Sequence, residues 1–302
     1  MYKFFILIFI LFAHIIFSYE IFITPSYKIY NFIKEKTILS DNLKFASLSI
    51  NSPFLELLDT NKSSGYIEYE NLYFKSYNIL PDKNLEGYLH EKFIIFDNNS
   101  VLFGTGNFTK GSIFEDLNIF IYSEDKNIVS LFLKEFDNFK NGNFGKNKRI
   151  IDKVINSKDL GKVVFVTGPS ENIFNVIDNF ILSSKKILYI FTFSFTDNRI
   201  LYNLEYLSSK NIDVKIIADN WNIKNYSNLK YLKSVKYTIS KKYRNMHLKV
   251  LINENGVLLG SYNLTYRARE KNDEFIIILY NKNIQKTMLD LFNKLWSEEK
   301  YE

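Results

Sequence analysis

Short apolar runs separated by polar turns recur along this chain of 302 residues. In the first half, two apolar runs flank the polar turn 97–100, and in the second half two similar runs flank the turn 253–256. Paired apolar runs joined by a short polar turn are typical of a β-hairpin. The pattern therefore predicts one hairpin in each half of the chain.

Apolar positions at helical spacing follow each hairpin, over 126–136 and 282–295, and predict two amphipathic helices with Phe292 and Trp296 in the core. The other predicted elements lie upstream of the hairpins: a strand at 45–50 and a helix at 53–58 in the first half, and helices at 173–181 and 200–207 with strands at 187–193 and 214–218 in the second half. Alternating helices and strands indicate an α/β fold, with a mixed, mostly parallel sheet flanked by helices in each half.

The boundary between the halves falls in a polar stretch rich in Asn, Gly and Lys, over 142–162. We expect a first half over 19–150, which is abbreviated because fewer elements precede its hairpin, and a second half over 151–302. Both halves are long enough to bury a core of their own.

The first 18 residues have the pattern of a signal peptide, because Lys3 precedes an apolar run over 4–17. This run of 14 residues is shorter than the ~20 needed to cross a bilayer, so an uncleaved anchor is the second interpretation. Both interpretations predict export, to the periplasm, the medium or the membrane surface.

Composition narrows the chemistry. With 46% hydrophobic and 24% charged residues, the chain is typical of a globular protein. The absence of Cys excludes disulfides, thiol nucleophiles and thiolate metal sites. A net charge of +6 favours anionic partners, such as phospholipid head groups or nucleic acid.

The hairpins carry the same polar residues in the same order. His90, Lys92, Thr105 and Asn107 in the first half recur as His247, Lys249, Ser261 and Asn263 in the second half. In a His-x-Lys sequence on a strand, both side chains point to the same face. The Asn that follows the Gly-containing corner after the second strand should lie beside them, so each hairpin is expected to present three polar side chains together.

These side chains are the groups that phosphodiester cleavage requires. One imidazole can attack phosphorus, a second can protonate the leaving oxygen and later activate water, and Lys and Asn can bind the nonbridging oxygens. The chain has three histidines, and the third, His14, lies in the signal segment, so none is left over for a metal site.

The pattern His-x-Lys-x4-Asp-x6-Gly-(Ser/Thr)-x-Asn, present twice, resembles the phospholipase D superfamily. The first copy matches throughout, with Asp97 at the Asp position. The second copy has a shorter turn, so counting forward from His247 puts Glu254 at that position, whereas counting back from Gly260 puts Asn253 there.

The resemblance implies an active site at the interface of two halves related by a pseudo-twofold axis, with no metal or other cofactor. It implies His90 as nucleophile and His247 as acid and base. It also implies that Glu274, on the His247 side, orients a histidine, and Asn118 stands at the corresponding place in the first half. Either the amide oxygen of Asn118 or a nearby carboxylate, Glu115 or Asp116, accepts from the ring of His90, or His90 lacks this support.

The activity implied is that of an exported phosphodiesterase acting on phospholipids, for which a monomer suffices. A metal-independent endonuclease and an inactive anion-binding protein are the alternatives, so the expected partners are a phospholipid or another phosphodiester, nucleic acid, and a membrane surface. Lys241, Lys242 and Arg244 could line the entrance or form a solvated loop. The aromatic stretch 66–77 is expected to be a half-buried strand, or else to contact lipid or bases.

Overall fold

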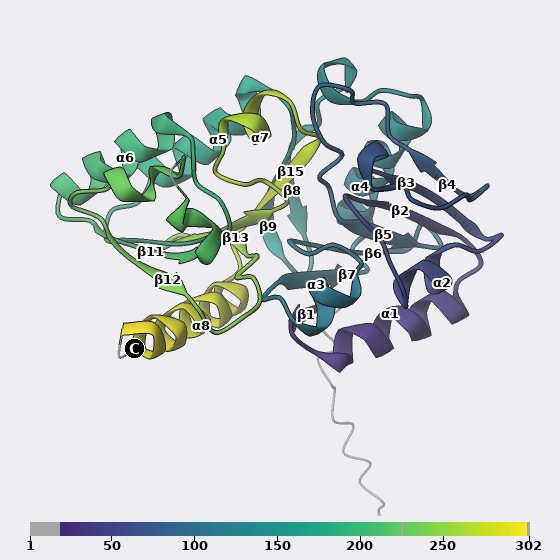
Figure 1. Ribbon diagram of the computed structural model, residues 1–302, viewed down its shortest axis with the longest axis horizontal. Helices are drawn as coiled ribbons and strands as arrows, with labels where there is room; N and C mark the ends of the chain where they lie inside the picture. The colour runs from purple at the N-terminus through teal and green to yellow at the C-terminus, as the bar shows by residue number, and fades with distance from the viewer. Residues whose placement is uncertain (1–18, 225, 301–302) are drawn as a thin grey trace, which may run out of the picture.

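The computed structural model describes residues 19–224 and 226–300, so the predicted signal peptide lies outside the described residues. Two α/β halves lie side by side, each built around one mixed sheet (Figure 1). No helix within the described part of the chain combines the length and the apolar character needed to cross a membrane.

The first half contains seven strands. Its elements are β1 (Tyr19–Ile23), α1 (Tyr27–Leu39), β2 (Leu43–Ser47), α2 (Phe54–Leu58), β3 (Ser63–Ile67), η1 (Tyr69–Asn71), β4 (Ile79–Pro81), β5 (Phe93–Phe96), β6 (Ser100–Gly104), α3 (Lys110–Phe114), β7 (Ile119–Ser123) and α4 (Lys126–Lys140). The strand order in the sheet is β1-β7-β6-β5-β2-β3-β4.

The second half follows the short helix η2 (Gly145–Asn147) and contains eight strands. Its elements are β8 (Asp152–Ser157), β9 (Gly161–Gly168), α5 (Glu171–Leu182), β10 (Ile187–Thr192), α6 (Asn198–Ser209), β11 (Asp213–Asp219), η3 (Asn220–Ile223), η4 (Asn228–Tyr231), β12 (Lys236–Ser240), β13 (Lys249–Asn253), β14 (Val257–Gly260), α7 (Tyr266–Glu270), β15 (Glu274–Leu279) and α8 (Lys282–Lys300). The strand order is β12-β11-β10-β13-β14-β15-β9-β8.

The two sheets have the same topology, since β9 takes the place of β1 and only β8 is additional. Two similar halves with mixed sheets and flanking helices are therefore confirmed. The pairing is less parallel than expected: only β2-β3-β4 and β10-β11-β12 are joined in parallel among the described strands. The other pairs are antiparallel, and the antiparallel strands β5-β6-β7 and β13-β14-β15 form the centre of each sheet.

The sequence pattern did not predict β1 and α1. They make the first half nearly as complete as the second, and the abbreviation is limited mainly to α2, which has 5 residues where α6 has 12. Helix α1 begins at a side-chain cap, because the hydroxyl of Ser26 accepts from the backbone N–H of Lys28.

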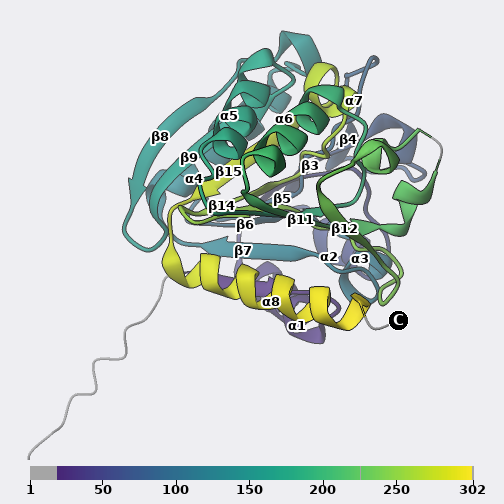
Figure 2. The same cartoon turned by 90° about the vertical axis from the view of Figure 1, so that its left-hand side faces the viewer.

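The helices cover both faces of each sheet. Figure 2 shows α5 and α6 on one side of the second sheet and α8 on the other. The central core joins the two sheets with α4 and α8. Phe132 of α4 lies at its middle, with its ring centroid 4.9 Å from that of Phe103 in the first sheet and 5.3 Å from that of Phe275 in the second. The halves therefore share one hydrophobic core.

Candidate active site

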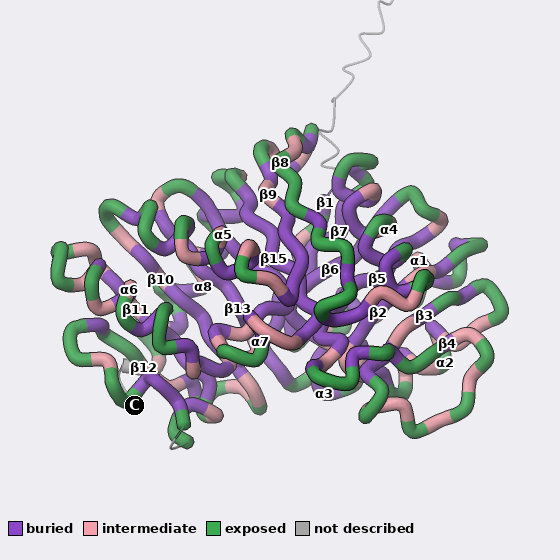
Figure 3. The backbone as a smooth tube through the Cα atoms, turned by 90° about the horizontal axis from the view of Figure 1, so that it is seen from above, coloured by how far each residue is buried: buried purple, intermediate pink, exposed green. Residues whose placement is uncertain are grey.

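Backbone bonds between the halves hold each histidine segment. The N–H of His90, just before β5, donates to the carbonyl of Asp273 at 3.0 Å, and the N–H of His247, just before β13, donates to the carbonyl of Leu117 at 2.9 Å. Each histidine is thus fixed to the residues that directly precede a strand of the opposite half, β15 for His90 and β7 for His247. This arrangement puts both histidines at the junction of the two sheets, where the central strands are buried (Figure 3).

The side-chain partners of the histidines cross between the halves. Nδ1 of His90 lies 2.9 Å from a carboxylate oxygen of Glu274, and Nδ1 of His247 lies 2.9 Å from the amide oxygen of Asn118. Ring nitrogens held in this way leave Nε2 directed away from the partner and available for chemistry. Both imidazoles are therefore oriented, one by a carboxylate and one by an amide.

This crossing corrects two expectations. Glu274 was expected to orient His247, in its own half, but it contacts His90. Asn118, or the nearby Glu115 or Asp116, was expected to accept from His90, but Asn118 contacts His247. The spacing of residues within each half could not show that the acceptor of each half contacts the histidine of the other half. His90 consequently has the charged acceptor.

Thr105 and Ser261 hold the two acceptors at equivalent places. The hydroxyl of Thr105 donates to the amide oxygen of Asn118 at 3.0 Å, and the hydroxyl of Ser261 donates to Glu274 at 2.5 Å. Each hydroxyl also accepts a backbone N–H from the next strand, that of Ile119 or Phe275. The small hydroxyl residue of each motif therefore fixes the group that orients the histidine of the other half.

Two lysines complete the cationic part of the site. Lys92 and Lys249 are buried, and each ammonium donates to the carbonyl of its own histidine, His90 or His247. Burial lowers the pKa of Lys92 to about 7, although Glu274 opposes this shift. Burial likewise lowers the pKa of Lys249 well below its usual range, and the charge of Lys92 acts in the same direction.

Both histidines are kept neutral in the free protein. Burial lowers the pKa of His90 to about 4, although the charge of Glu274 opposes the shift. Burial also lowers the pKa of His247 well below its usual value, and the ammonium groups of Lys249 and Lys92 lower it further. Protonation of one ring disfavours protonation of the other, because a charge on His90 lowers the pKa of His247 in the same direction.

Asn107 and Asn263 follow the corners after β6 and β14, as the motif requires. Both are half-buried, and neither side-chain oxygen has a hydrogen-bond partner among the described residues. Buried polar atoms without partners are rare in folded proteins. These amides are therefore available to a ligand.

The residues at the Asp position of each motif lie at the far ends of β5 and β13. Asp97 accepts the backbone N–H groups of Asp41 and Asn42, both at 2.8 Å. Glu254 likewise accepts the N–H of Lys185 at 2.6 Å. Asn253 is buried in its own turn, where it accepts from Asn255 and Gly256. Glu254 is thus the structural counterpart of Asp97, and both support a turn rather than the histidines.

Basic residues near His247 are largely paired with acids. Arg244 makes two bonds of 2.8 Å to Asp116 and an ion pair of 2.8 Å with Glu115. Gly111 leaves room for this guanidinium, because a Cβ there would lie 2.1 Å from it. Lys242 pairs with Glu298 at 2.7 Å. Arg244 therefore joins the two halves beside the site.

The aromatic stretch 66–77 is only partly the strand that we expected. Tyr66, in β3, is half-buried and packs against Phe136, with 5.6 Å between the ring centroids. Tyr73 and Tyr77 are exposed because the chain leaves the sheet after β3. Figure 3 shows the loop between β3 and β4 as a mixture of exposed and intermediate residues.

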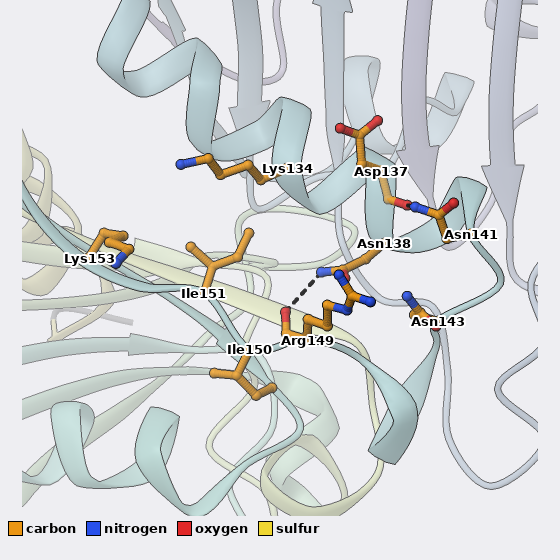
Figure 4. A pocket seen from close by; sticks show the side chains of 9 residues that line it. All are labelled: Lys134, Asp137, Asn138, Asn141, Asn143, Arg149, Ile150, Ile151 and Lys153. Atoms are coloured by element: carbon orange, nitrogen blue, oxygen red, sulfur yellow. Dashed lines mark hydrogen bonds between the residues drawn. The ribbon is translucent and has the colours of Figure 1, made fainter.

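One surface groove of about 340 Å³ lies between α4 and the connector of the two halves (Figure 4). Its lining includes Lys134, Asp137 and Arg149 but none of the predicted site residues. It is separate from the histidine site. In the ranges 19–224 and 226–300, no group of three or more histidines and carboxylates is arranged to hold a metal ion.

Comparisons with known proteins identify the class. The model of the family described as "Cardiolipin synthase, PLD-like domain" matches residues 56–140 and 177–296. These ranges cover more than half of the chain, so the protein belongs to the phospholipase D-like family that its two motifs resemble. Among curated proteins, none matches the sequence.

Two solved structures share the fold over most of this chain, and a third is similar in sequence over part of it. Phosphatidylserine synthase from Haemophilus influenzae Rd KW20 has a TM-score of 0.70 and 15% identity, over 93% of this chain and 86% of that one. Polyphosphate kinase from Porphyromonas gingivalis has a TM-score of 0.66 and 12% identity, over 91% of this chain but only 46% of that one. Nuc, a phospholipase D family member from Salmonella typhimurium, has 25% identity and a TM-score of 0.43, over 45% of this chain and 93% of that one.

Proposed function

We propose that this protein is an exported phosphodiesterase that hydrolyses phospholipids through a phosphohistidine intermediate. The observation that carries the proposal is the crossed pair of oriented imidazoles, with His90 held by Glu274 and His247 by Asn118. Family membership supports phosphodiester chemistry, and the substrate and the individual roles belong to the proposal.

His90 is the nucleophile in this scheme. Because Glu274 accepts the proton of Nδ1, Nε2 keeps its lone pair and attacks phosphorus. The bond from phosphorus to the leaving alcohol breaks, and His247, which takes up a proton on Nε2 when the anionic substrate binds, gives that proton to the leaving oxygen. Water then attacks the phosphohistidine, His247 takes a proton from the water, and the phosphorus–nitrogen bond breaks.

The other polar residues of the two motifs bind the phosphate in this scheme. Lys92 and Lys249, with the side-chain N–H groups of Asn107 and Asn263, donate to the nonbridging oxygens and stabilise the charge that develops on them. The bound anion also raises the pKa of His247, because it offsets the neighbouring ammonium charges that lower this pKa in the free protein.

Two features support a lipid rather than a nucleic acid as substrate. Arg244 and Lys242 are already paired with acids, which reduces the positive charge offered to a polymer backbone. The loops after β3 and β11 carry exposed apolar side chains, including Tyr73, Tyr77 and Ile223, which suit a membrane surface.

Export is part of the proposal and follows from the apolar run over 4–17. Fusing residues 1–25 to a reporter that is active only outside the cytoplasm tests it. Reporter activity is expected, and its loss when two residues of the apolar run are replaced by Lys is the matching control. A fusion that is inactive outside the cytoplasm would overturn this part.

Turnover of phosphatidylcholine, phosphatidylglycerol and cardiolipin vesicles by wild type, His90→Ala and His247→Ala tests the activity. We expect hydrolysis by wild type alone, and a phosphoprotein that is stable to base and labile to acid in the His247→Ala protein. Equal turnover by all three proteins would contradict the assignment of His90 and His247 to catalysis. DNA cleavage in EDTA without lipid turnover would identify an endonuclease, and failure of both assays together with failure to trap a phosphoprotein would favour an inactive binding protein.

A further inference from the structure

A fully buried lysine lies in the connector between the halves. The ammonium of Lys148 lies 2.6 Å from Glu135, 2.8 Å from Glu91 and 3.2 Å from Asp273, and all four side chains are completely buried. Buried charges are costly unless they are closely paired. One cation therefore holds together three segments: the residues just before β5, helix α4, and the residues just before β15.

Two of the three carboxylates are covalent neighbours of the proposed nucleophile and its partner. Glu91 stands between His90 and Lys92, and Asp273 immediately precedes Glu274. The carbonyl of Asp273 also accepts the backbone N–H of His90 at 3.0 Å. The third carboxylate, on α4, has no sequence neighbour in the site.

Both sides of the connector are fixed next to Lys148. The N–H of Gly145 donates to Asp273 at 2.9 Å, before the lysine. Arg149, directly after the lysine, is held by its carbonyl, which accepts from the side chain of Asn138 at 2.9 Å (Figure 4). The same Asn138 amide donates to Glu135 at 2.9 Å. Lys148 therefore has a defined position from which to fix its partners.

We propose that Lys148 is a positioning residue for His90, acting through Glu91 and Asp273 to keep the ring of His90 against Glu274. The inference rests on the proposed function, in which His90 attacks phosphorus. A reacting group must be held within a fraction of an ångström of its productive geometry. The ammonium does not touch substrate in this scheme, and it acts only through the residues just before β5 and β15.

An isosteric pair of variants separates positioning from general stability. Asp273→Asn and Glu135→Gln each remove one carboxylate from Lys148, but only Asp273 adjoins Glu274. We expect Asp273→Asn to lower kcat about 10- to 100-fold with KM changed by less than about twofold, as for residues that support catalytic ligands. Glu135→Gln should lower the Tm but change kcat by less than about threefold.

Lys148→Met tests the lysine itself, and Lys148→Arg tests rescue by a retained charge. We expect a loss of kcat in the Met variant at least as large as in Asp273→Asn, and partial recovery in the Arg variant. Lys146→Met is the matched control, because Lys146 lies on the same connector and makes an exposed pair with Glu86 at 2.9 Å. It should leave kcat unchanged.

A spectroscopic readout keeps the test independent of turnover. The chain has three histidines, His14, His90 and His247, so ¹⁵N-histidine spectra can be assigned with a single variant of each. We expect Asp273→Asn to broaden or lose the Nδ1 proton signal of His90 and to leave that of His247 unchanged, whereas Glu135→Gln changes neither signal.

The outcomes distinguish the two proposals. If wild type hydrolyses phosphodiesters but both isosteric variants lose kcat equally, in proportion to their loss of Tm, Lys148 is a structural residue and the inference is overturned. An unchanged His90 signal in Asp273→Asn overturns it as well. If wild type has no activity on any phosphodiester, the proposed function fails, and the spectra still decide whether the cluster positions His90.

Discussion

Replacing Glu274 by Gln tests which histidine attacks phosphorus. The carboxylate accepts from the ring of His90 at 2.9 Å and from the hydroxyl of Ser261 at 2.5 Å, and it is fully buried. Its pKa stays below the usual value although burial opposes ionisation, because His90 and Lys92 stabilise the anion. The substitution keeps the shape of the side chain and removes the charge.

The expected loss can be estimated from the hydrogen bond. A bond to a buried charged group contributes about 1.5–3 kcal/mol. At about 1.4 kcal/mol per factor of ten, the first chemical step should slow about 10- to 160-fold. If the new amide donates to Nδ1, it places the other proton on Nε2, and the loss grows towards ~10⁴-fold, because the attacking nitrogen no longer has a lone pair.

A soluble bis(p-nitrophenyl) phosphate assay in a rapid-quench instrument separates the two steps. The first p-nitrophenol reports the attack by histidine, and the later steady state reports hydrolysis of the intermediate. Glu171→Gln is the control, because its ion pair with Arg199 at 2.7 Å lies on the surface of α5. A first step slowed by less than about threefold in Glu274→Gln would refute the assignment of His90 as nucleophile.

Three further predictions concern the acceptors, the turns and pH. Asn118→Asp should raise the pKa of His247, seen by ¹⁵N spectroscopy, and cost about 1–3 kcal/mol in chemical unfolding, because the amide N–H that donates to the carbonyl of Ser112 at 3.0 Å is lost. Unaltered titration of His247 would contradict it. Asp97→Ala should lower stability by about 1–2 kcal/mol and leave kcat unchanged, since its carboxylate supports two backbone N–H groups away from the histidines; a loss of kcat beyond threefold would place it in the catalytic machinery. Burial lowers the pKa of His90 from 6.5 to about 4, so the unfolded chain binds more protons than the folded chain between these pH values. The free energy of unfolding should therefore fall by about 3 kcal/mol as the pH drops through this window. His90→Leu should flatten the dependence of Tm on pH there, and an unchanged slope would argue against the shift.

The fold was predictable where local pattern decides it. The two hairpins and the helices after them follow from apolar periodicity, because their buried faces repeat at strand or helix spacing. Helix α1 was missed, since its buried residues, such as Ile29 and Ile33, are interspersed with Lys and Asn and give only a weak apolar stripe. The largely antiparallel pairing depends on which strands become neighbours, and no local pattern encodes this.

The residues of the candidate site could be predicted from the sequence, but the contacts between their side chains could not. His90, His247 and their lysines could be found from the repeated motif, because alternation on a strand places them on one face. The partners of the rings could not, since Glu274 reaches His90 across 184 positions of sequence. The Lys148 cluster was also missed, because single charged residues scattered over the chain carry no spacing signal before the chain folds.

The exchange of acceptors between the halves makes the two imidazoles of the site chemically different. A protein assembled from two copies of one half would have either two carboxylates or two amides beside its imidazoles, and its two rings would be chemically equivalent. In this chain the acceptor is a carboxylate beside His90 and an amide beside His247, so the two imidazoles differ chemically and the two halves are not interchangeable.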